Sequence, residues 1–139
     1  SKDPHTQVGA CIVNEDKHIV GVGYNGMPNG CDDSVYPWGR TGDFADQKYP
    51  YVVHAELNAI LNASTSLKGC RIYVSLFPCN ECCKAIIQSG IREVVYLSDK
   101  YAATDSTKAS KRMLASAGVT CRRMETDLTS VPVNFVAEE

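Results

Sequence analysis

Two short segments, residues 49–60 and 77–82, constrain this chain more than any other feature, because together they supply a set of metal ligands. The first carries His54 and Glu56, and the second carries Cys79 and Cys82. Zn²⁺ takes nitrogen and sulfur ligands in a tetrahedral arrangement, so three protein ligands leave one position for a water of lowered pKa. We therefore predict a catalytic zinc site ligated by His54, Cys79 and Cys82. Glu56 is close enough to contact the water without ligating the metal.

The spacing of these residues places both segments at the starts of helices. Cys79 and Cys82 are three residues apart, so on a helix they share one face. Pro78 suits the entry to that helix, and His54 precedes an apolar run of helical period at residues 57–61. A helix N-terminus favours the thiolate, which is the form of cysteine that binds metal. We expect two helix N-termini directed at one metal.

Each half of the motif also has a simpler interpretation. A Cys-x-x-Cys pair alone is equally a redox pair or half of a structural zinc site, and a lone histidine near a helix start is most often a surface residue. A structural zinc module needs a fourth protein ligand. The nearest candidate, Cys83, points about 100° away from Cys82 around the helix, and Glu56 would then have no role. His-x-Glu followed by Pro-Cys-x-x-Cys is instead the pattern of zinc-dependent nucleobase deaminases.

Size, charge and cysteine content narrow the class of protein. A chain of 139 residues suffices for one domain with a real core, so we expect a single domain over residues 1–139. The net charge of −2 offers no electrostatic footprint for nucleic acid and favours a small substrate. We find no signal peptide and no long apolar run, and expect no membrane span. Seven cysteines, an odd number, fit free thiols in a reducing compartment, so we expect a cytoplasmic location.

The cysteines outside the motif are predicted to be mostly core residues. Cys11, Cys70 and Cys121 lie in apolar runs that resemble strands, where cysteine is a small hydrophobic side chain. Cys83 is expected to face the core. Cys31 lies in a loop rich in Gly and Asp, where a second metal or nucleotide contact is the less favoured alternative.

Hydrophobic periodicity and turn signals predict the element order β-β-α-β-α-β-α-β. The predicted strands are 8–13, 18–24, 70–75, 93–97 and 119–123, and the predicted helices are 55–63, 80–89 and 105–117. The first two strands form a hairpin, and Gly90 and Gly118 end the second and third helices. The β-α-β-α-β part implies parallel strands with right-handed crossovers. We expect a three-layer α/β/α sandwich around a mixed five-stranded sheet, with ligands bound beyond the strand carboxyl ends, where both motif helices begin.

The segment from about residue 25 to residue 51 shows little periodicity. It opens with turn residues, 25–30, and contains Trp38 and Arg40 among several Gly, Asp and Pro residues. A structureless loop of this length is uncommon in a compact domain and is usually functional or mobile. We expect a substrate or effector loop, with a plain surface insertion as the alternative.

Five segments extend the motif to a likeness that covers nearly the whole chain up to Arg123: 8–12, 23–31, 49–60, 77–82 and 98–101. On these residues the chain resembles the cytidine deaminase superfamily and, more narrowly, the deoxycytidylate deaminase family. The zinc motif is shared by many deaminases, whereas the 23–31 segment and the long loop before His54 are more specific.

This resemblance implies a zinc-dependent hydrolase that converts dCMP to dUMP and ammonia in pyrimidine nucleotide biosynthesis, supplying dUMP for dTTP synthesis. Glu56 would carry a proton from the water to N3 of cytosine and help to expel the amine. The Ala55 amide, an unpaired donor at a helix start, could hold the base carbonyl. By resemblance, Asn25 binds the deoxyribose 3′-hydroxyl and Tyr101 packs on the substrate. The simpler alternatives are that Asn25 is only a turn residue and that Tyr101 is only an aromatic residue of a loop.

The resemblance also implies a homohexamer that dCTP activates and dTTP inhibits, with Mg²⁺ accompanying a triphosphate effector. The predicted effector residues are Gly23, Tyr24, Gly26, Met27, Asn29 and Gly30. Family members usually have a helix before the first strand, and this chain begins where that helix would end. The family draws substrate-phosphate contacts from this junction, so Ser1 and Lys2 are predicted contacts. The alternatives within the fold are deaminases of dCTP, nucleosides, guanine or tRNA adenosine, the last disfavoured by the net charge.

Overall fold

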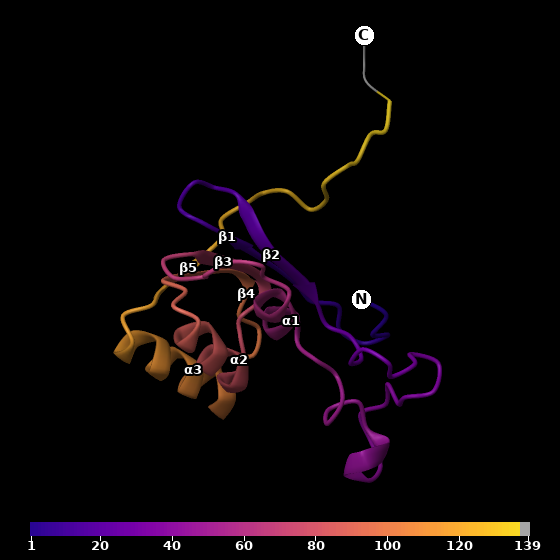
Figure 1. Ribbon diagram of the computed structural model, residues 1–139. Helices are drawn as coiled ribbons and strands as arrows, with labels where there is room; N and C mark the ends of the chain where they lie inside the picture. The colour runs from indigo at the N-terminus through magenta and orange to yellow at the C-terminus, as the bar shows by residue number, and fades with distance from the viewer. Residues whose placement is uncertain (137–139) are drawn as a thin grey trace.

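The computed structural model describes residues 1–136, which form a mixed five-stranded sheet and three α-helices (Figure 1). The strands are β1 (Gly9–Val13), β2 (Ile19–Tyr24), β3 (Arg71–Leu76), β4 (Glu93–Ser98) and β5 (Thr120–Arg123), in the order β2-β1-β3-β4-β5. The helices are α1 (Ala55–Leu61), α2 (Asn80–Gln88) and α3 (Asp105–Ser116). The predicted α/β class and element order are confirmed. The last three residues of the predicted domain, 137–139, lie outside the described residues.

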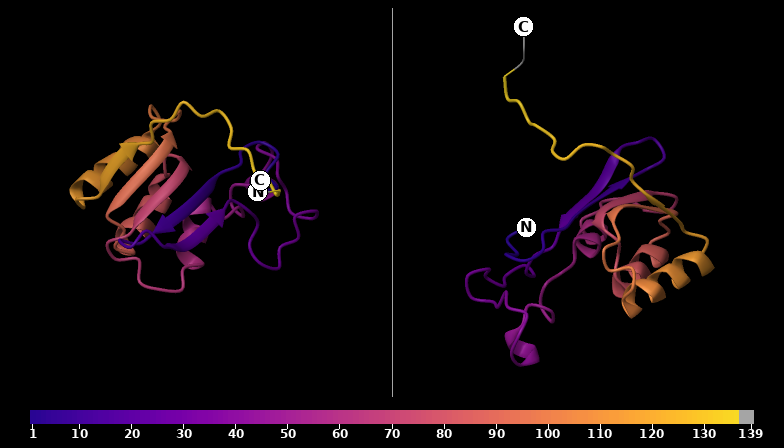
Figure 2. Two further views of the ribbon diagram at one scale, coloured as in Figure 1. Left: turned by 90° about the horizontal axis from the view of Figure 1, so that it is seen from above. Right: turned by 180° about the vertical axis from the view of Figure 1, so that it is seen from behind.

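The direction of the strands explains where the helices lie. β1 pairs antiparallel with β2 and β3, whereas β3, β4 and β5 run parallel. The two crossovers through α2 and α3 step in the same direction along the sheet, so right-handed connections bring both helices to one face. α1 packs on β1 and β2 and against α2, on that same face (Figures 1 and 2). The predicted three-layer sandwich has a helical layer on each face of the sheet. Within residues 1–136, all three helices belong to the layer on this one face.

The core lies between the sheet and this helical layer. Ile12, Ile72 and Val94 from three neighbouring strands are fully buried. They belong to one apolar cluster with Ile86 of α2 and Leu114 of α3. Burial of each such side chain stabilises the fold by about 1.5–3 kcal/mol relative to leaving it exposed. This cluster fixes α2 on the sheet, and with it the start of α2.

The cysteines outside the motif differ in how far they are buried. Cys70 and Cys83 are buried, as predicted, and Cys11 is half-buried. The prediction of a core position is wrong for Cys121, which is exposed. Its strand, β5, is at the edge of the sheet and all four of its residues are exposed.

A glycine in β2 allows α1 to lie directly on the hairpin. A Cβ atom at Gly23 would lie 2.3 Å from both the Ala55 carbonyl oxygen and the Ala59 amide nitrogen, so no larger residue fits without moving backbone. This close approach fixes the first turn of α1, and therefore the position of His54 at its N-cap, relative to the hairpin.

The helix ends follow the predicted signals. Gly90 and Gly118 follow α2 and α3 with φ of 85° and 72°, the left-handed conformation that suits a helix C-terminus. Residues 25–54 contain a short 3-10 helix, Phe44–Asp46, and an isolated bridge between Gly26 and Val53, and this segment projects away from the sheet (Figure 1). Among the described residues, no helix has the length and apolar character needed to cross a lipid bilayer.

Candidate active site

Two helix N-termini meet at the predicted metal site. His54 is the N-cap of α1, and Cys79 is the N-cap of α2, where its Sγ accepts a hydrogen bond from the Cys82 backbone amide at 3.5 Å. Both N-cap residues have an extended backbone, as is usual where a chain enters a helix, so each side chain lies at the N-terminal end of its helix. The predicted convergence of the two helix starts is confirmed.

The three ligand atoms have the spacing of a tetrahedral metal site. The Nδ1 atom of His54 lies 3.4 Å from Cys79 Sγ and 3.5 Å from Cys82 Sγ, and all three ligand atoms lie within 4.8 Å of one another. Zinc bonds of about 2.0 Å to nitrogen and 2.3 Å to sulfur give tetrahedron edges of about 3.6–3.8 Å. The donor atoms and their separations therefore fit Zn²⁺.

The electrostatics of the two thiols also favour a cation between them. The hydrogen bond between the Cys79 and Cys82 side chains lowers the pKa of the Cys79 thiol to about 4. The same bond raises the pKa of the Cys82 thiol. The bond to Cys79 raises the pKa of the His54 imidazole. A divalent cation stabilises both thiolates and the neutral imidazole at once, so metal binding would release protons.

Cys83 is excluded as a fourth ligand by its position. Its thiol is fully buried, lies 3.8 Å from the Pro78 carbonyl oxygen, and has its pKa raised to about 11 by burial. Within residues 1–136, the metal-ligating cluster consists of His54, Cys79 and Cys82. The structure thus provides three protein ligands, the number typical of a catalytic zinc.

Glu56 lies beside the ligands without joining them. Only 4% of the residue is exposed, and burial raises the pKa of its carboxyl group. Glu56 lines the same cavity as the ligand candidates His54 and Cys79. A buried carboxyl group beside a candidate metal site is a typical candidate for a group that accepts and donates a proton.

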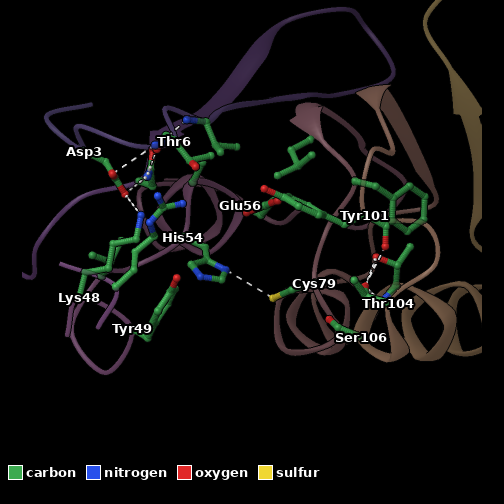
Figure 3. A pocket seen from close by; sticks show the side chains of 18 residues that line it. Asp3, Thr6, Lys48, Tyr49, His54, Glu56, Cys79, Tyr101, Thr104 and Ser106 are labelled. Atoms are coloured by element: carbon green, nitrogen blue, oxygen red, sulfur yellow. Dashed lines mark hydrogen bonds and ion pairs between the residues drawn. The ribbon is translucent and has the colours of Figure 1, made fainter. Parts of the chain in front are cut away.

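These side chains line a cavity of about 470 Å³, within the size range of small-molecule sites. In Figure 3 the His54, Glu56 and Cys79 side chains lie between Asp3 and Lys48 on one side and Tyr101 with the start of α3 on the other. The cavity is therefore built from the N-terminal segment, the long loop and the first turns of all three helices.

Asn25 lines this cavity but is already engaged by the protein. Its Oδ1 accepts a hydrogen bond from the Val8 amide at 2.8 Å. Its Nδ2 donates to the Thr6 carbonyl at 2.8 Å and to Asp3 Oδ2 at 3.4 Å. Asn25 thus ties the N-terminal segment to β2, and only Oδ1 retains a free lone pair for a ligand.

The other predicted substrate contacts fall into two groups. Ala55 and Tyr101 line the cavity, and the backbone N–H of Ala55, in the first turn of α1, has no intrahelical acceptor. Ser1 and Lys2 are not among the lining residues, and the Lys2 ammonium instead lies 3.1 Å from the Asp33 carboxylate. Their phosphate contacts stay a prediction.

The predicted effector residues are not among those that line the cavity. Gly23 packs against α1, and Tyr24 is 61% exposed. Gly26 exchanges two backbone hydrogen bonds with Val53, the residue before His54. Met27, Asn29 and Gly30 follow in the same turn segment, and the effector role of all six residues stays a prediction.

Sequence reasoning missed a buried ion pair at the cavity wall. Lys48 Nζ lies 2.6 Å from Asp3 Oδ2, with side-chain exposures of 9% and 1%. Asp3 Oδ1 also accepts hydrogen bonds from the amides of His5 and Thr6. Burial raises the pKa of Asp3, but these hydrogen bonds outweigh it, so the pKa is lowered overall. The pair joins segments far apart in sequence, and no local pattern marks it.

Comparisons with known proteins agree with this site. Residues 1–98 match the family described as the cytidine and deoxycytidylate deaminase zinc-binding region. The chain is 57% identical over 137 residues to human deoxycytidylate deaminase, covering 97% of this chain and 77% of the relative. It is 51% identical over 142 residues to the probable deoxycytidylate deaminase of Drosophila melanogaster, covering 97% and 70%. The crystal structure of cyanophage S-TIM5 dCMP deaminase with dCMP and dUMP matches with a TM-score of 0.70 at 28% identity, covering 89% of this chain and 85% of that one.

Replacing His54 by Ala is expected to remove most of the bound zinc, because only two protein ligands remain. Elemental analysis of the purified variant should show well under the roughly one zinc per chain expected of the parent. Thermal unfolding should also occur at a lower temperature, because metal binding contributes to folding. The matched control is Cys83→Ala, which removes a neighbouring thiol outside the cluster and should retain zinc. Full zinc occupancy in His54→Ala would contradict the ligand assignment.

Proposed function

The chain belongs to the cytidine and deoxycytidylate deaminase family, and we propose that it hydrolyses dCMP to dUMP and ammonia. The observation that carries this proposal is the His/Cys/Cys ligand set beside the buried Glu56 carboxyl group, at the wall of a cavity of about 470 Å³. Two comparisons support dCMP as the substrate. A relative that is 57% identical is named deoxycytidylate deaminase, and the matching cyanophage enzyme was crystallised with dCMP and dUMP.

In this mechanism Glu56 moves the protons. Zinc held by His54, Cys79 and Cys82 would supply a water whose pKa is near neutral. Glu56 accepts a proton from that water, delivers it to N3 of the cytosine ring, and helps the 4-amino group to leave as ammonia. Burial raises the pKa of this carboxyl group, which favours the protonated form that Glu56 takes after accepting the proton. The oxygen of the water becomes the 4-oxo group of dUMP.

The remaining cavity residues would orient the nucleotide. The N–H of Ala55, which has no intrahelical acceptor, would donate to the carbonyl oxygen of the base. The remaining lone pair of Asn25 Oδ1 can accept a hydrogen bond from the deoxyribose 3′-hydroxyl. Tyr101 lies in the opposite wall, where its ring would pack on the substrate. These roles rest on lining positions and on the family resemblance.

Replacing Glu56 by Gln keeps the size of the side chain but removes its ability to carry a proton. We expect the rate of ammonia release from dCMP to fall by about 10²–10⁴-fold while bound zinc is unchanged. Glu81→Gln is the control, because Glu81 lies in the first turn of α2 with its side chain 72% exposed. It should keep the parental rate. A rate near the parental value in Glu56→Gln would rule out the proton-transfer role.

Regulation of the enzyme is a further part of the proposal. We propose a homohexamer that dCTP, with Mg²⁺, activates and dTTP inhibits, and that works in the cytoplasm, where its seven thiols stay reduced. The family resemblance supports the effectors, which would bind Gly23, Tyr24, Gly26, Met27, Asn29 and Gly30. The paired hydrogen bonds between Gly26 and Val53 support a link to the site, because Val53 precedes the ligand His54.

Initial rates at increasing dCMP concentration test this regulation. We expect a sigmoidal curve that becomes hyperbolic when dCTP and Mg²⁺ are added, and a rightward shift with dTTP. Sedimentation of the same sample should give the mass of a hexamer. A hyperbolic curve that neither nucleotide changes would exclude allosteric control by this site.

A further inference from the structure

The cavity has few positive charges that could meet an anionic substrate. Among the described residues that line it, Arg40 and Lys48 are the two with lysine or arginine side chains. Both come from the long loop between β2 and α1. The Lys48 amide donates a hydrogen bond to the Gly39 carbonyl at 2.9 Å, so the backbone next to Arg40 is held against Lys48. The two cations therefore belong to the same wall of the cavity.

The charge of Lys48 is already matched by the protein. Its ammonium group lies 2.6 Å from Asp3 Oδ2, and both side chains are almost completely buried. Separating this pair would leave a buried carboxylate without its counter-ion, which is strongly unfavourable. Lys48 is therefore a structural cation that holds the loop to the N-terminal segment.

Among the described residues, Arg40 differs from Lys48 and Lys2 in having no carboxylate partner. Lys2 pairs with Asp33 at 3.1 Å and does not line the cavity. Within residues 1–136, no carboxylate lies within 4.0 Å of the Arg40 guanidinium group, and Arg40 is exposed. A guanidinium group at a cavity wall with all five N–H donors available can bind a phosphate through two parallel hydrogen bonds.

We propose that Arg40 binds the 5′-phosphate of the substrate and so makes the enzyme select a nucleotide over a nucleoside. This inference rests on the proposed deamination of dCMP. The Thr6 hydroxyl, which lines the same cavity and has no hydrogen-bond partner within residues 1–136, offers a neutral donor to the same ligand. The buried Asp3–Lys48 pair fixes the loop that carries Arg40, so the phosphate contact is prepared before the substrate binds.

The test compares a nucleotide with the nucleoside that lacks only its phosphate. Steady-state ammonia release from dCMP and from deoxycytidine is measured for the parent enzyme and for Arg40→Ala, Lys2→Ala and Arg112→Ala. Arg112 is an exposed residue of α3 that does not line the cavity, so its variant controls for the loss of one positive charge. Zinc content is measured on each sample.

We expect Arg40→Ala to lower kcat/KM for dCMP by roughly 10- to 150-fold, mainly through a higher KM, because one charge-assisted contact is lost. The kcat/KM for deoxycytidine should stay within about twofold, since the nucleoside has no group for Arg40 to bind. Arg112→Ala should match the parent. Equal losses on both substrates, unchanged dCMP kinetics, or a loss of dCMP preference in Lys2→Ala with none in Arg40→Ala would each overturn the proposal.

Binding measurements separate this proposal from the proposed reaction. Calorimetric titration with dUMP and with deoxyuridine needs no turnover. If the parent hydrolyses neither cytosine substrate, the proposed function fails. The proposed phosphate contact of Arg40 is then supported if the affinity of dUMP for the parent is roughly 10- to 150-fold higher than its affinity for the Arg40→Ala variant. Equal dUMP affinities, or no binding of dUMP by the parent, overturn it.

Discussion

The active site depends on one constraint, that α1 and α2 begin at the same place. α2 starts directly after β3, at the carboxyl edge of the parallel strands, where ligand sites of α/β sheets form. α1 is brought beside it by the contact between Gly23 and the α1 backbone, which no larger side chain permits. Because His54 and Cys79 are the N-caps of these helices, their side chains must meet. The metal ligands are thus a consequence of helix packing.

The second constraint is the buried Asp3–Lys48 ion pair, which closes the cavity on the side away from α3. Losing one partner of such a pair typically costs about 3–5 kcal/mol, because the other charge stays buried. The pair joins the N-terminal segment to the loop before His54, and Asn25 fastens that segment to β2 by three hydrogen bonds. A loop without regular structure is therefore held in place where it borders the site. This explains how a largely irregular segment can form part of the cavity wall.

The sequence predicted those parts of the molecule that depend on local chemistry. His54, Cys79 and Cys82 could be identified because zinc restricts its ligands to few residue types at helix-compatible spacings. The strands and helices followed from apolar periodicity and from glycines such as Gly90 that end them. Glu56 was predicted as the proton carrier because it lies two residues from the histidine, and the structure places it, buried, in the lining of the same cavity.

Features set by distant contacts could not be predicted in the same way. Asp3 and Lys48 meet only in the folded chain, and their ion pair leaves no periodic signal. Cys121 looked like a core residue because its apolar run does not reveal that β5 is an edge strand. The phosphate contacts expected from Ser1 and Lys2 came from family resemblance. The sequence could not show that Arg40 is free to bind an anion, because this depends on which carboxylates pair with Lys2 and Lys48 in the folded chain.

Zinc-dependent release of ammonia from dCMP is the most direct test of the proposed enzyme. One protein sample is assayed with dCMP, dCTP, deoxycytidine and cytidine, with its zinc content measured alongside. The assay is repeated after removal of zinc by a chelator and after zinc is restored. We expect dCMP to react fastest, activity to disappear with the metal, and activity to return with it. A sample with one zinc per chain that releases no ammonia from dCMP would contradict the proposed function.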